Sequence, residues 1–417
     1  MPEKNRGKDQ SDALTKFWDD FERRNTGEPE FLQAVHELIE TLPDGEFLSN
    51  QLPLLRILVE PERSISFRVT WEDDKGNVNV NRGWRVQFNN ALGPYKGGIR
   101  FHPNVNESVL KFLAFEQTFK NALTGLPLGG AKGGSDFNPK GRSQGELRRF
   151  CQSFMTELHK HIGENRDIPA GDIGVGSEAI GYLFGQYKRI SDQFVGTLTG
   201  KDPLFGGSVL RAEATGYGVV YFLEEVLSQR DESIEGKRIA LSGAGNVALH
   251  AAEKFLQHGA HVLTLSDSQG YVSSENGVDA EQLKDIKKGK ADGRALEDIA
   301  TELDLTYKAG ERLWSVNCDI AVPCATQNEL DEKDAQSLVE HGCGYVVCGA
   351  NMPCTPKAIH VFEDAKVVFV PSKAANAGGV AVSAFERTQN AILYDWDTDK
   401  VDNRLLDVMK SIHVCCG

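Results

Sequence analysis

Apolar residues recur at helical spacing near the start of the chain. Phe17, Trp18 and Phe21 form one set, and a second set runs from Phe31 to Leu42. Residues three and four positions apart share one face of a helix, so each set marks an apolar stripe. The pattern predicts two amphipathic helices that pack against the rest of the protein.

After these helices the apolar period changes to two, the period of a strand with one buried face. Apolar and polar residues alternate over residues 65–71, a turn signal follows at 73–77, and Val78 and Val80 resume the alternation. These residues predict a β-hairpin. The apolar positions of residues 84–88 predict another strand.

Two further helices are predicted in the first half of the chain, over residues 108–123 and 145–161. Gln117 and Lys120 lie one turn apart and share a face of the first of these helices. Residues 196–208 are rich in glycine and contain a proline. This segment is therefore the predicted hinge between two domains.

Beyond the hinge, strands and helices alternate. Residues 237–242 form a predicted strand, a glycine turn and a helix follow from Gly243, and residues 261–265 form the next strand. Later strands are predicted at residues 320–322, 345–348 and 367–370. The pattern predicts an α/β fold whose second part opens like a dinucleotide-binding unit.

The chain has 417 residues, of which 40% are hydrophobic, and this length favours two domains. The net charge of −14 argues against nucleic acid and anionic membranes as partners, since both attract clustered positive charge. The start of the chain is polar, and no apolar run has the length of a membrane span. We expect a soluble, cytoplasmic protein that binds anionic ligands through local lysines and arginines.

None of the eight cysteines forms a C-x-x-C pair, and the histidines near them do not complete the spacing of a zinc site. We therefore expect reduced thiols in the core and no bound metal. Adjacent Cys415 and Cys416 at the end of the chain carry no predicted function.

Lys132 stands between two glycine pairs in otherwise apolar surroundings. Glycines let a ligand approach the backbone, and a lysine in a dry cleft has a lowered pKa because its ammonium group loses hydration. Such a lysine exchanges protons near neutral pH. The alternative interpretation is a flexible glycine loop that carries an ordinary charge.

Two other lysines favour the functional interpretation. Lys96 lies in a second glycine-flanked segment, and Lys120 lies on a predicted helix. Converging ammonium groups would bind a small dianion and lower one another's pKa. Asp172 places a carboxylate in a further glycine-rich turn, where the alternative is a residue that only forms the turn.

Gly243, Gly245 and Ala248 form a G-x-G-x-x-A pattern between a predicted strand and a predicted helix. The dinucleotide-binding motif must lie in that context to function. Gly243 would make the tight turn, Gly245 would let a pyrophosphate approach the helix N-terminus, and Ala248 would allow close packing. The alternative is a tight turn that binds no ligand.

The end of the second strand distinguishes NAD from NADP. An acidic residue there binds the ribose 2′-hydroxyl and selects NAD, whereas small or basic residues admit a 2′-phosphate. Ser266 comes first, Asp267 follows, and a basic cluster of Lys287, Lys288, Lys290 and Arg294 lies downstream. The serine and the cluster favour NADP, although a charge run is also typical of a solvated helix face.

Several long motifs, in order over residues 50–413, resemble those of the hexameric, small-subunit glutamate dehydrogenases of the Glu/Leu/Phe/Val dehydrogenase superfamily. They are Gly93–Arg100, Phe115–Gln117, Leu128–Asp136, Pro169–Gly176, Glu213–Gly218, Cys324–Asn328, Gly349–Pro353 and Asn376–Val380. The resemblance implies a substrate-binding and oligomerisation domain at 1–205 and a Rossmann-like NAD(P)-binding domain at 206–417. It also implies a homohexamer, with catalysis in the cleft between the two domains.

The implied reaction is the reversible, NADPH-dependent reductive amination of 2-oxoglutarate by ammonia to L-glutamate. Lys132 would be the catalytic lysine that polarises the keto oxygen. Asp172 would be the carboxylate that exchanges protons with the nitrogen and the leaving water. The cofactor would deliver hydride to the iminium carbon.

The resemblance also implies binding residues. Lys96 and Ser383 would hold the side-chain carboxylate of glutamate, and Lys120 with Gln117 would hold the α-carboxylate. Together with the residues of the glycine turn and of the second strand, the predicted cofactor site comprises Thr215, Gly243, Gly245, Asn246, Val247, Ser266, Lys288, Ala325, Thr326, Asn351 and Asn376.

Three features depart from the family pattern. Glu178 stands where an arginine is common, Cys348 stands where an acidic residue is common, and the chain ends at Gly417, before a helix that in relatives returns to the first domain. A truncated, low-activity form that binds cofactor or assists assembly is therefore one alternative. A related dehydrogenase with another amino acid as substrate is a second, against which Lys96 and Ser383 argue, because an unpaired lysine is costly to bury.

Overall fold

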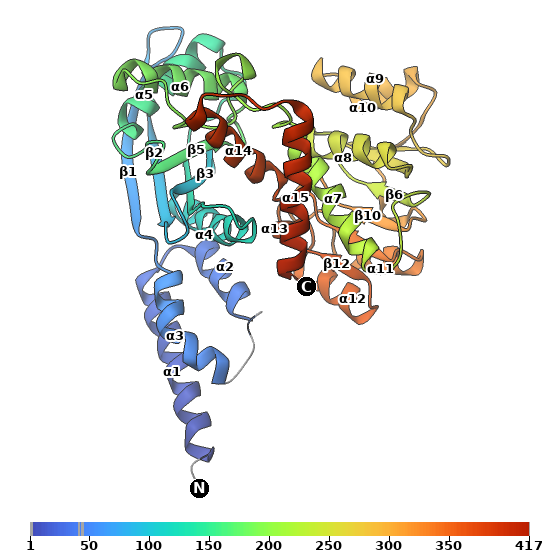
Figure 1. The fold of residues 1–417 in the computed structure, drawn as a ribbon, viewed down its shortest axis with the longest axis horizontal. Helices are drawn as coiled ribbons and strands as arrows, with labels where there is room; N and C mark the ends of the chain where they lie inside the picture. Colours follow the sequence, from blue (N-terminus) through green and yellow to red (C-terminus); the bar gives the residue numbers. More distant parts are fainter. Residues whose placement is uncertain (1–2, 41, 43–45, 417) are drawn as a thin grey trace. The chain divides into compact units, whose positions relative to one another are not determined.

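The structure is a computed structural model that describes residues 3–40, 42 and 46–416. Its contacts divide the chain into two compact units (Figure 1). Unit 1 comprises the chain up to Ala122, Leu126–Ser208 and Glu386–Asp395, and unit 2 comprises Leu123–Gly125, Val209–Phe385 and the chain from Trp396. The predicted domains were 1–205 and 206–417, and the return of residues 386–395 to unit 1 was not predicted.

Three helices begin unit 1. They are α1 (Glu3–Arg24), α2 (Pro29–Glu40) and α3 (Glu46–Leu58). The first two confirm the amphipathic helices predicted from the apolar spacing. Phe17, Phe21 and Phe31 are buried and join apolar side chains of the sheet in one cluster, so these helices cover one face of that sheet.

A mixed five-stranded sheet forms the centre of unit 1. Its strands are β1 (Arg63–Glu72), β2 (Val78–Asn89), β3 (Tyr95–Phe101), β4 (Gly130–Ser135) and β5 (Asp167–Gly171), in the order β1-β2-β4-β3-β5. β1 and β2 pair antiparallel, which confirms the predicted hairpin. The prediction of another strand over residues 84–88 was wrong, because β2 continues through them. Gly83 within β2 leaves space for the ring of Phe67 across the hairpin.

The remaining helices of unit 1 lie on both faces of the sheet. They are α4 (Glu107–Leu123), α5 (Gln144–Leu158), α6 (Ser177–Ser191) and the short 3-10 helix η1 (Pro203–Phe205). α4 confirms the predicted helix over residues 108–123, and α5 ends before the predicted residue 161. Phe115 of α4 packs in the same cluster as α1 and α2, whereas Phe150 of α5 and Leu183 of α6 pack in a second cluster with Phe101 of the sheet.

Residues 196–208, the predicted hinge, are anchored within unit 1. Lys201 Nζ contacts Glu386 Oε1 at 2.6 Å, and the backbone N–H of Gly200 donates to Glu386 Oε2 at 2.8 Å. Both side chains of the ion pair are buried. Glu386 lies in α14 (Gly378–Ile392), along which the chain returns to unit 1. The pair therefore joins residues 196–208, after which the chain passes into unit 2, to α14, along which the chain returns.

Strands and helices alternate in unit 2, as the sequence predicts. The strands are β6 (Arg238–Leu241), β7 (His261–Ser266), β8 (Gly270–Ser273), β9 (Thr306–Ala309), β10 (Ile320–Val322), β11 (Tyr345–Val347) and β12 (Val368–Val370). Their order is β12-β11-β10-β6-β7-β8-β9. β8 pairs antiparallel with both β7 and β9, and the other neighbouring strands pair parallel. The five parallel strands confirm the sequence prediction, whereas β8 and β9 were not predicted.

Unit 2 also contains helices, several of which pack against this second sheet. They are α7 (Ala214–Ser228), α8 (Asn246–Gln257), α9 (Ala280–Ala291), α10 (Leu296–Glu302), η2 (Leu313–Ser315), α11 (Glu332–Glu340), α12 (Pro356–Asp364), α13 (Ser372–Ala375) and α15 (Thr398–Cys416). α15 runs alongside α7 (Figure 1). The hydroxyl of Tyr221 in α7 donates to Asp402 Oδ1 of α15 at 2.6 Å, which helps to fix the last helix on unit 2.

Six of the eight cysteines are buried, and Cys415 and Cys416 are exposed. Burial raises the pKa of the Cys151 and Cys324 thiols, which keeps them protonated. Within the described part of the chain, no three His, Cys, Asp or Glu side chains gather in an arrangement that could hold a metal ion. No helix among the described residues is both long and apolar enough to cross a membrane.

Arg85 and Asp167 form an ion pair that is completely buried in unit 1. Arg85 Nε donates to Asp167 Oδ2 at 2.9 Å, its Nη2 contacts Oδ1, and its Nη1 donates to the carbonyl of Gly97 at 3.1 Å. Gln87 Nε2 donates to Asp167 Oδ2 at 2.9 Å. The pair therefore ties β2 to β3 and β5.

Replacing Arg85 with methionine leaves the Asp167 carboxylate buried without its charge partner. Because removing one partner strands a charge in the interior, we expect Arg85→Met to lower the free energy of unfolding by about 3–5 kcal/mol. Urea unfolding measures the loss. The control is Arg149→Met, which removes an exposed pair with Asp74 and should cost far less. Equal losses in the two variants would contradict the structural role of the buried pair.

Candidate active site

Parallel strands bring charged side chains to one face of the sheet in unit 1. β3 pairs in parallel with both β4 and β5. Side chains alternate between faces along a strand, and partners in register share a face. Lys96 and Arg100 of β3 therefore lie on the same face as Lys132 of β4, and Asp172 follows the carboxyl end of β5.

The glycine-rich segment around Lys132 is not the loop that the sequence suggested but the buried strand β4. Its glycines allow close packing on both faces. A Cβ on Gly130 would lie 2.0 Å from Thr118 Oγ1 of α4, and a Cβ on Gly133 would lie 3.0 Å from Arg85 Cδ. Lys132 is therefore held in a paired strand, and the interpretation as a flexible loop charge is wrong.

Lys132, Asp172 and Arg100 form a compact charged cluster. Lys132 Nζ lies 3.3 Å from Asp172 Oδ2, and Arg100 Nε donates to the same oxygen at 2.7 Å. Lys132 is 6% exposed, and the side chains of Arg100 and Asp172 are each 18% exposed. Two cations thus share one carboxylate oxygen in a site that is largely shielded from water.

Burial lowers the pKa of Lys132, because an ammonium group loses hydration in the protein interior. The Asp172 carboxylate opposes this shift, and repulsion from Arg100 and Arg85 adds to it. The resulting pKa lies below the ordinary lysine value. Lys132 therefore releases its proton more readily than a surface lysine does.

Burial by itself raises the pKa of the Asp172 carboxyl, but the charges of Lys132 and Arg100 outweigh that effect. The resulting pKa lies below the ordinary aspartate value, so Asp172 is ionised at neutral pH. A carboxylate next to a lysine with a lowered pKa can accept and return protons during a reaction. The cluster is therefore suited to acid–base chemistry.

Lys96 is 1% exposed, and its Nζ donates to Thr199 Oγ1 at 2.8 Å. The backbone N–H of Thr199 donates to the carbonyl of Pro169 in β5 at 3.0 Å, which fixes the threonine. Next to Lys96, a Cβ on Gly97 would lie 1.6 Å from the Ala131 carbonyl oxygen. Glycine at this position is therefore required for β3 to approach β4.

Gln117 and Lys120 both occupy partly buried positions on α4. Gln117 Nε2 donates to Asn121 Oδ1 at 2.7 Å, and Asn121 Nδ2 donates to the carbonyl oxygens of Lys96 at 3.0 Å and Gly129 at 2.5 Å. These bonds dock α4 onto β3 and onto the start of β4. The three predicted lysines thus lie on elements of unit 1 that pack together.

The sequence did not indicate Arg100, Asn121 or Thr199 as site residues. The alternation of β3 could have indicated Arg100, because it lies four positions after Lys96 and so on the same face. Asn121 and Thr199 meet Lys96 only through folding, since they lie on α4 and in the segment after α6. No signal in the sequence marks that contact.

In unit 2 the predicted cofactor residues follow the carboxyl ends of neighbouring parallel strands. Residues 243–247 follow β6, Ser266 ends β7, Ala325 and Thr326 follow β10, and Asn351 follows β11. The chain passes from β6 to β7 on one side and later returns to β10 on the other side of β6, so the strand order reverses at β6. Open α/β sheets bind ligands at such a switch point.

The turn between β6 and α8 fits a dinucleotide pyrophosphate. Gly243 has a φ of +86°, and a Cβ there would lie 3.2 Å from the Cys324 carbonyl oxygen. At Gly245, the N-cap of α8, a Cβ would meet no described atom within 4 Å, and no described side chain caps the helix. The first N–H groups of α8 can therefore bind an anion. Ala248 is buried, as close packing of helix and strand requires.

Asn376 fits the carboxamide of a nicotinamide. The residue is buried, and its Nδ2 donates to the Gly349 carbonyl at 3.2 Å and to Asn351 Oδ1 at 2.8 Å. Its own Oδ1 is buried and has no hydrogen-bond partner among the described residues. A buried acceptor is costly to leave unpaired, and the amide N–H of a nicotinamide would satisfy it.

Ser383 and Thr215 lie on α14 and α7 of unit 2. Arg211 Nε donates to Ser383 Oγ at 3.0 Å, and that hydroxyl donates to the Gly379 carbonyl at 3.0 Å. The helices approach so closely that a Cβ on Gly379 would lie 2.5 Å from Thr215 Oγ1. Arg211, which the sequence did not indicate, places a cation beside Ser383.

Ser266 and the downstream basic cluster have different surroundings. Ser266 Oγ accepts the backbone N–H of Gly243 at 2.8 Å, so the serine supports the glycine turn directly. Lys288 is exposed on α9, and Lys287 and Arg294 of the same cluster form ion pairs with glutamates. These pairs favour a solvated helix face, and a role of Lys288 at the cofactor stays a prediction.

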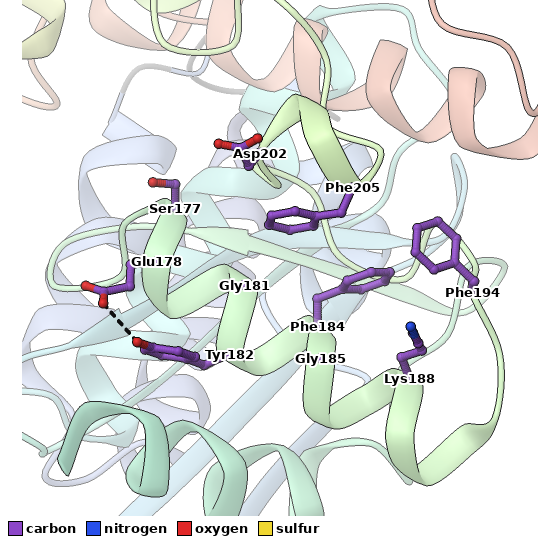
Figure 2. Close-up of a pocket in the computed structure, with 10 residues that line it drawn as sticks. All are labelled: Ser177, Glu178, Gly181, Tyr182, Phe184, Gly185, Lys188, Phe194, Asp202 and Phe205. Carbon is purple, nitrogen blue, oxygen red and sulfur yellow. Dashed lines mark hydrogen bonds between the residues drawn. The ribbon is translucent and has the colours of Figure 1, made fainter. Parts of the chain in front are cut away.

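Glu178, which departs from the family pattern, turns its carboxylate along α6. Figure 2 shows it bonded to the Tyr182 hydroxyl, which donates to Glu178 Oε1 at 2.9 Å. The two side chains line a pocket of about 510 Å³ whose walls include Phe184 and Phe205. The charges that lower the pKa of Asp172 come instead from Lys132 and Arg100, as described above.

A dinucleotide-type sheet with an anion-binding turn, together with a buried lysine and carboxylate, defines a two-domain, nucleotide-dependent oxidoreductase. The chain belongs to the Glutamate/Leucine/Phenylalanine/Valine dehydrogenase family. Residues 206–416 match that family, and residues 61–189 match the Glu/Leu/Phe/Val dehydrogenase, dimerisation domain. These matches confirm membership of the Glu/Leu/Phe/Val dehydrogenase superfamily, to which the sequence motifs pointed.

Similar proteins carry glutamate dehydrogenase names. The chain is 56% identical to an NADP-specific glutamate dehydrogenase of Chlorella sorokiniana, covering 92% of this chain and 74% of that protein. It is 52% identical to the NADP-specific glutamate dehydrogenase of Escherichia coli, covering 98% and 92%. The crystal structure of Plasmodium falciparum glutamate dehydrogenase superposes with a TM-score of 0.95 at 48% identity, covering 98% and 88%.

Asp172→Asn tests the electrostatics of the cluster. The substitution removes the carboxylate that raises the Lys132 pKa, so we expect this pKa to fall further. Reductive methylation by formaldehyde and cyanoborohydride, followed at Lys132 by peptide mass spectrometry across pH, reports the neutral amine. The midpoint should move to lower pH, whereas Asp74→Asn, outside the cluster, should not move it. An unchanged midpoint in Asp172→Asn would show that the two groups are not coupled.

Proposed function

We propose that this protein is a glutamate dehydrogenase that catalyses the reversible, NADPH-dependent reductive amination of 2-oxoglutarate with ammonia. The observation that carries the proposal is the Lys132–Asp172 contact of 3.3 Å on a face that also bears Lys96 and Arg100. Several cations beside a single carboxylate favour a dianionic substrate. The glutamate dehydrogenase names of relatives that span most of this chain support the same substrate.

Substrate binding follows from the buried cations. We assign Lys96 to the side-chain carboxylate of the substrate, with Ser383 as its second partner. Lys120 and Gln117 are assigned to the α-carboxylate. A buried lysine at position 96 disfavours the alkyl substrates of related dehydrogenases, because its ammonium group would face an apolar side chain.

The chemistry follows from the protonation states of the cluster. Protonated Lys132 donates a hydrogen bond to the keto oxygen, polarises the carbonyl while ammonia adds to the carbon, and transfers its proton to that oxygen to give the hydroxyl of a carbinolamine. Asp172 takes a proton from the new ammonium group of the carbinolamine and returns one to the departing hydroxyl, which leaves as water. NADPH, when bound, supplies the hydride that reduces the resulting iminium carbon.

NADP is the proposed cofactor. The Chlorella sorokiniana and Escherichia coli relatives are named NADP-specific, and Ser266 at the end of β7 is small and neutral. A relative of Bacteroides fragilis at 49% identity is named NAD-specific, so the choice is tested directly on this chain. Initial rates with NADPH and NADH at equal 2-oxoglutarate and ammonium should give a higher kcat/KM for NADPH, and a preference for NADH would refute the choice.

Lys132→Ala and Asp172→Asn should each lower kcat by about 10²-fold or more, because each removes a group that transfers a proton or polarises the substrate. NADPH affinity should persist in both variants, since the proposed cofactor residues lie in unit 2. Steady-state rates and fluorescence titration with NADPH measure the two quantities. Lys160→Ala, which removes an exposed lysine paired with Glu157, is the matched control and should retain full activity. High activity of both cluster variants would overturn the assigned roles.

We further propose that the protein is a cytoplasmic homohexamer. The N-terminal part matches a dimerisation domain, and a relative from Thermus thermophilus at 26% identity is described as hetero-hexameric. Val78 and Val80 are exposed on β2 next to the edge strand β1, where contact with a second copy would cover them. A cytoplasmic location agrees with six buried cysteine thiols.

Multi-angle light scattering tests the assembly. We expect a molar mass of six chains that is independent of protein concentration over the working range, because an obligate interface stays formed on dilution. A mass of one chain at all concentrations would contradict the proposed assembly.

A further inference from the structure

Arg100 occupies the position in β3 that lies beside the end of β5. The parallel ladder of these strands runs to Ile99 and Gly171 and is continued by a hydrogen bond from Phe101 N–H to the Ile173 carbonyl at 2.9 Å. Arg100 and Asp172 are therefore neighbours across the ladder. The backbone on both sides holds the two side chains next to each other.

The contact between them is directional. Arg100 Nε donates to Asp172 Oδ2 at 2.7 Å, whereas Lys132 Nζ reaches the same oxygen at the longer distance of 3.3 Å. The shorter bond fixes the carboxylate from the side of β3. The described contacts of the carboxylate thus gather on Oδ2, which orients Oδ1 as the oxygen available to a reacting group.

We propose that Arg100 is a positioning residue of this active site: it holds Asp172 by Oδ2, so that Oδ1 faces the substrate nitrogen and Lys132 remains free to bind the keto oxygen. The proposal rests on the proposed dehydrogenase function for the identity of the substrate. Without Arg100, Asp172 and Lys132 would form a closer one-to-one ion pair. Such a pair would bind its proton more tightly and would hold both groups away from the substrate.

The charges around the cluster agree with this role. Arg100 lowers the pKa of both partners, since its positive charge favours ionised Asp172 and disfavours protonated Lys132. Lys132 of β4 is the other cation that acts on Asp172, and Arg85 of β2 adds a smaller repulsion on Lys132. Loss of the Arg100 charge should therefore raise the pKa of Lys132 and of Asp172 together.

Arg100→Gln and Arg100→Lys separate charge from geometry. Glutamine removes the charge, whereas lysine keeps it but has no donor at the position of Nε. Arg149→Gln is the control, because it removes an arginine that pairs with Asp74 on the far α5 side of unit 1. Thermal unfolding of each variant shows whether it is folded.

Two measurements are made on each variant. The first is the pH dependence of reductive methylation at Lys132, which needs no catalysis. The second is the pH profile of kcat/KM for 2-oxoglutarate, with kcat at the optimum. For Arg100→Gln we expect both midpoints to move to higher pH and kcat to fall by about 10²-fold, the scale of a misplaced catalytic group.

For Arg100→Lys we expect the methylation midpoint to stay near that of the unmodified protein while kcat still falls, because charge is kept and orientation is lost. Arg149→Gln should match the unmodified protein in every measurement. An unmoved methylation midpoint in Arg100→Gln, or full kcat in Arg100→Lys, would overturn the proposal. If Arg100→Gln does not fold, the kcat of Arg100→Lys decides.

An error in the proposed function can be distinguished from an error in the role of Arg100. In that case the unmodified protein would not turn over 2-oxoglutarate with NADPH, and the kinetic measurement would give no profile for any variant. The methylation midpoint would still report whether Arg100 controls the Lys132–Asp172 pair. A shifted midpoint without turnover would refute the substrate and retain the coupling.

Discussion

Close packing of the glycine strand β4 is the constraint on which the site depends. A side chain at Gly130 would collide with Thr118 of α4, and one at Gly133 would crowd Arg85 on the opposite face. Glycine on both sides of Lys132 therefore lets β4 lie buried between β2 and β3 while a single lysine projects from it. A larger residue would push the strand away from its neighbours and move the lysine from Asp172.

The same packing creates an electrostatic problem that the fold solves with paired charges. Burial works against the charged form of Lys132, and Asp172 compensates for it while remaining shared with Arg100. On the other face, Arg85 is fully neutralised by Asp167 and fixes the spacing of β2, β3 and β5. One buried pair is thus closed and structural. The Lys132–Asp172 pair has a second cation, Arg100, and the side chain of Asp172 is partly exposed. A lysine and a carboxylate in such surroundings are suited to catalysis.

In unit 2 the decisive feature is the edge at which parallel strands end. The turn after β6 presents helix N–H groups, and Asn376 presents a buried oxygen that no described group satisfies. Each is an incomplete set of hydrogen bonds that a dinucleotide could complete, the first with its central pyrophosphate and the second with its nicotinamide. Ser266, which the sequence suggested as the small residue that admits a 2′-phosphate, also supports the glycine turn through Gly243. The serine that ends β7 therefore helps to shape the turn that follows β6.

The sequence by itself determined the alternation of strands and helices, the hairpin, the glycine motif and the three lysines, because periodicity and glycine spacing are local properties. It did not determine that the Lys132 segment is a strand, since its glycines fit a loop equally well and only neighbouring side chains show why they are needed. It also left out Arg100, Thr199 and Arg211 as partners of predicted residues, because those contacts join positions far apart in the chain. The sequence shows which residue types are present. Two cations share one Asp172 oxygen only because β3, β4 and β5 pair with one another.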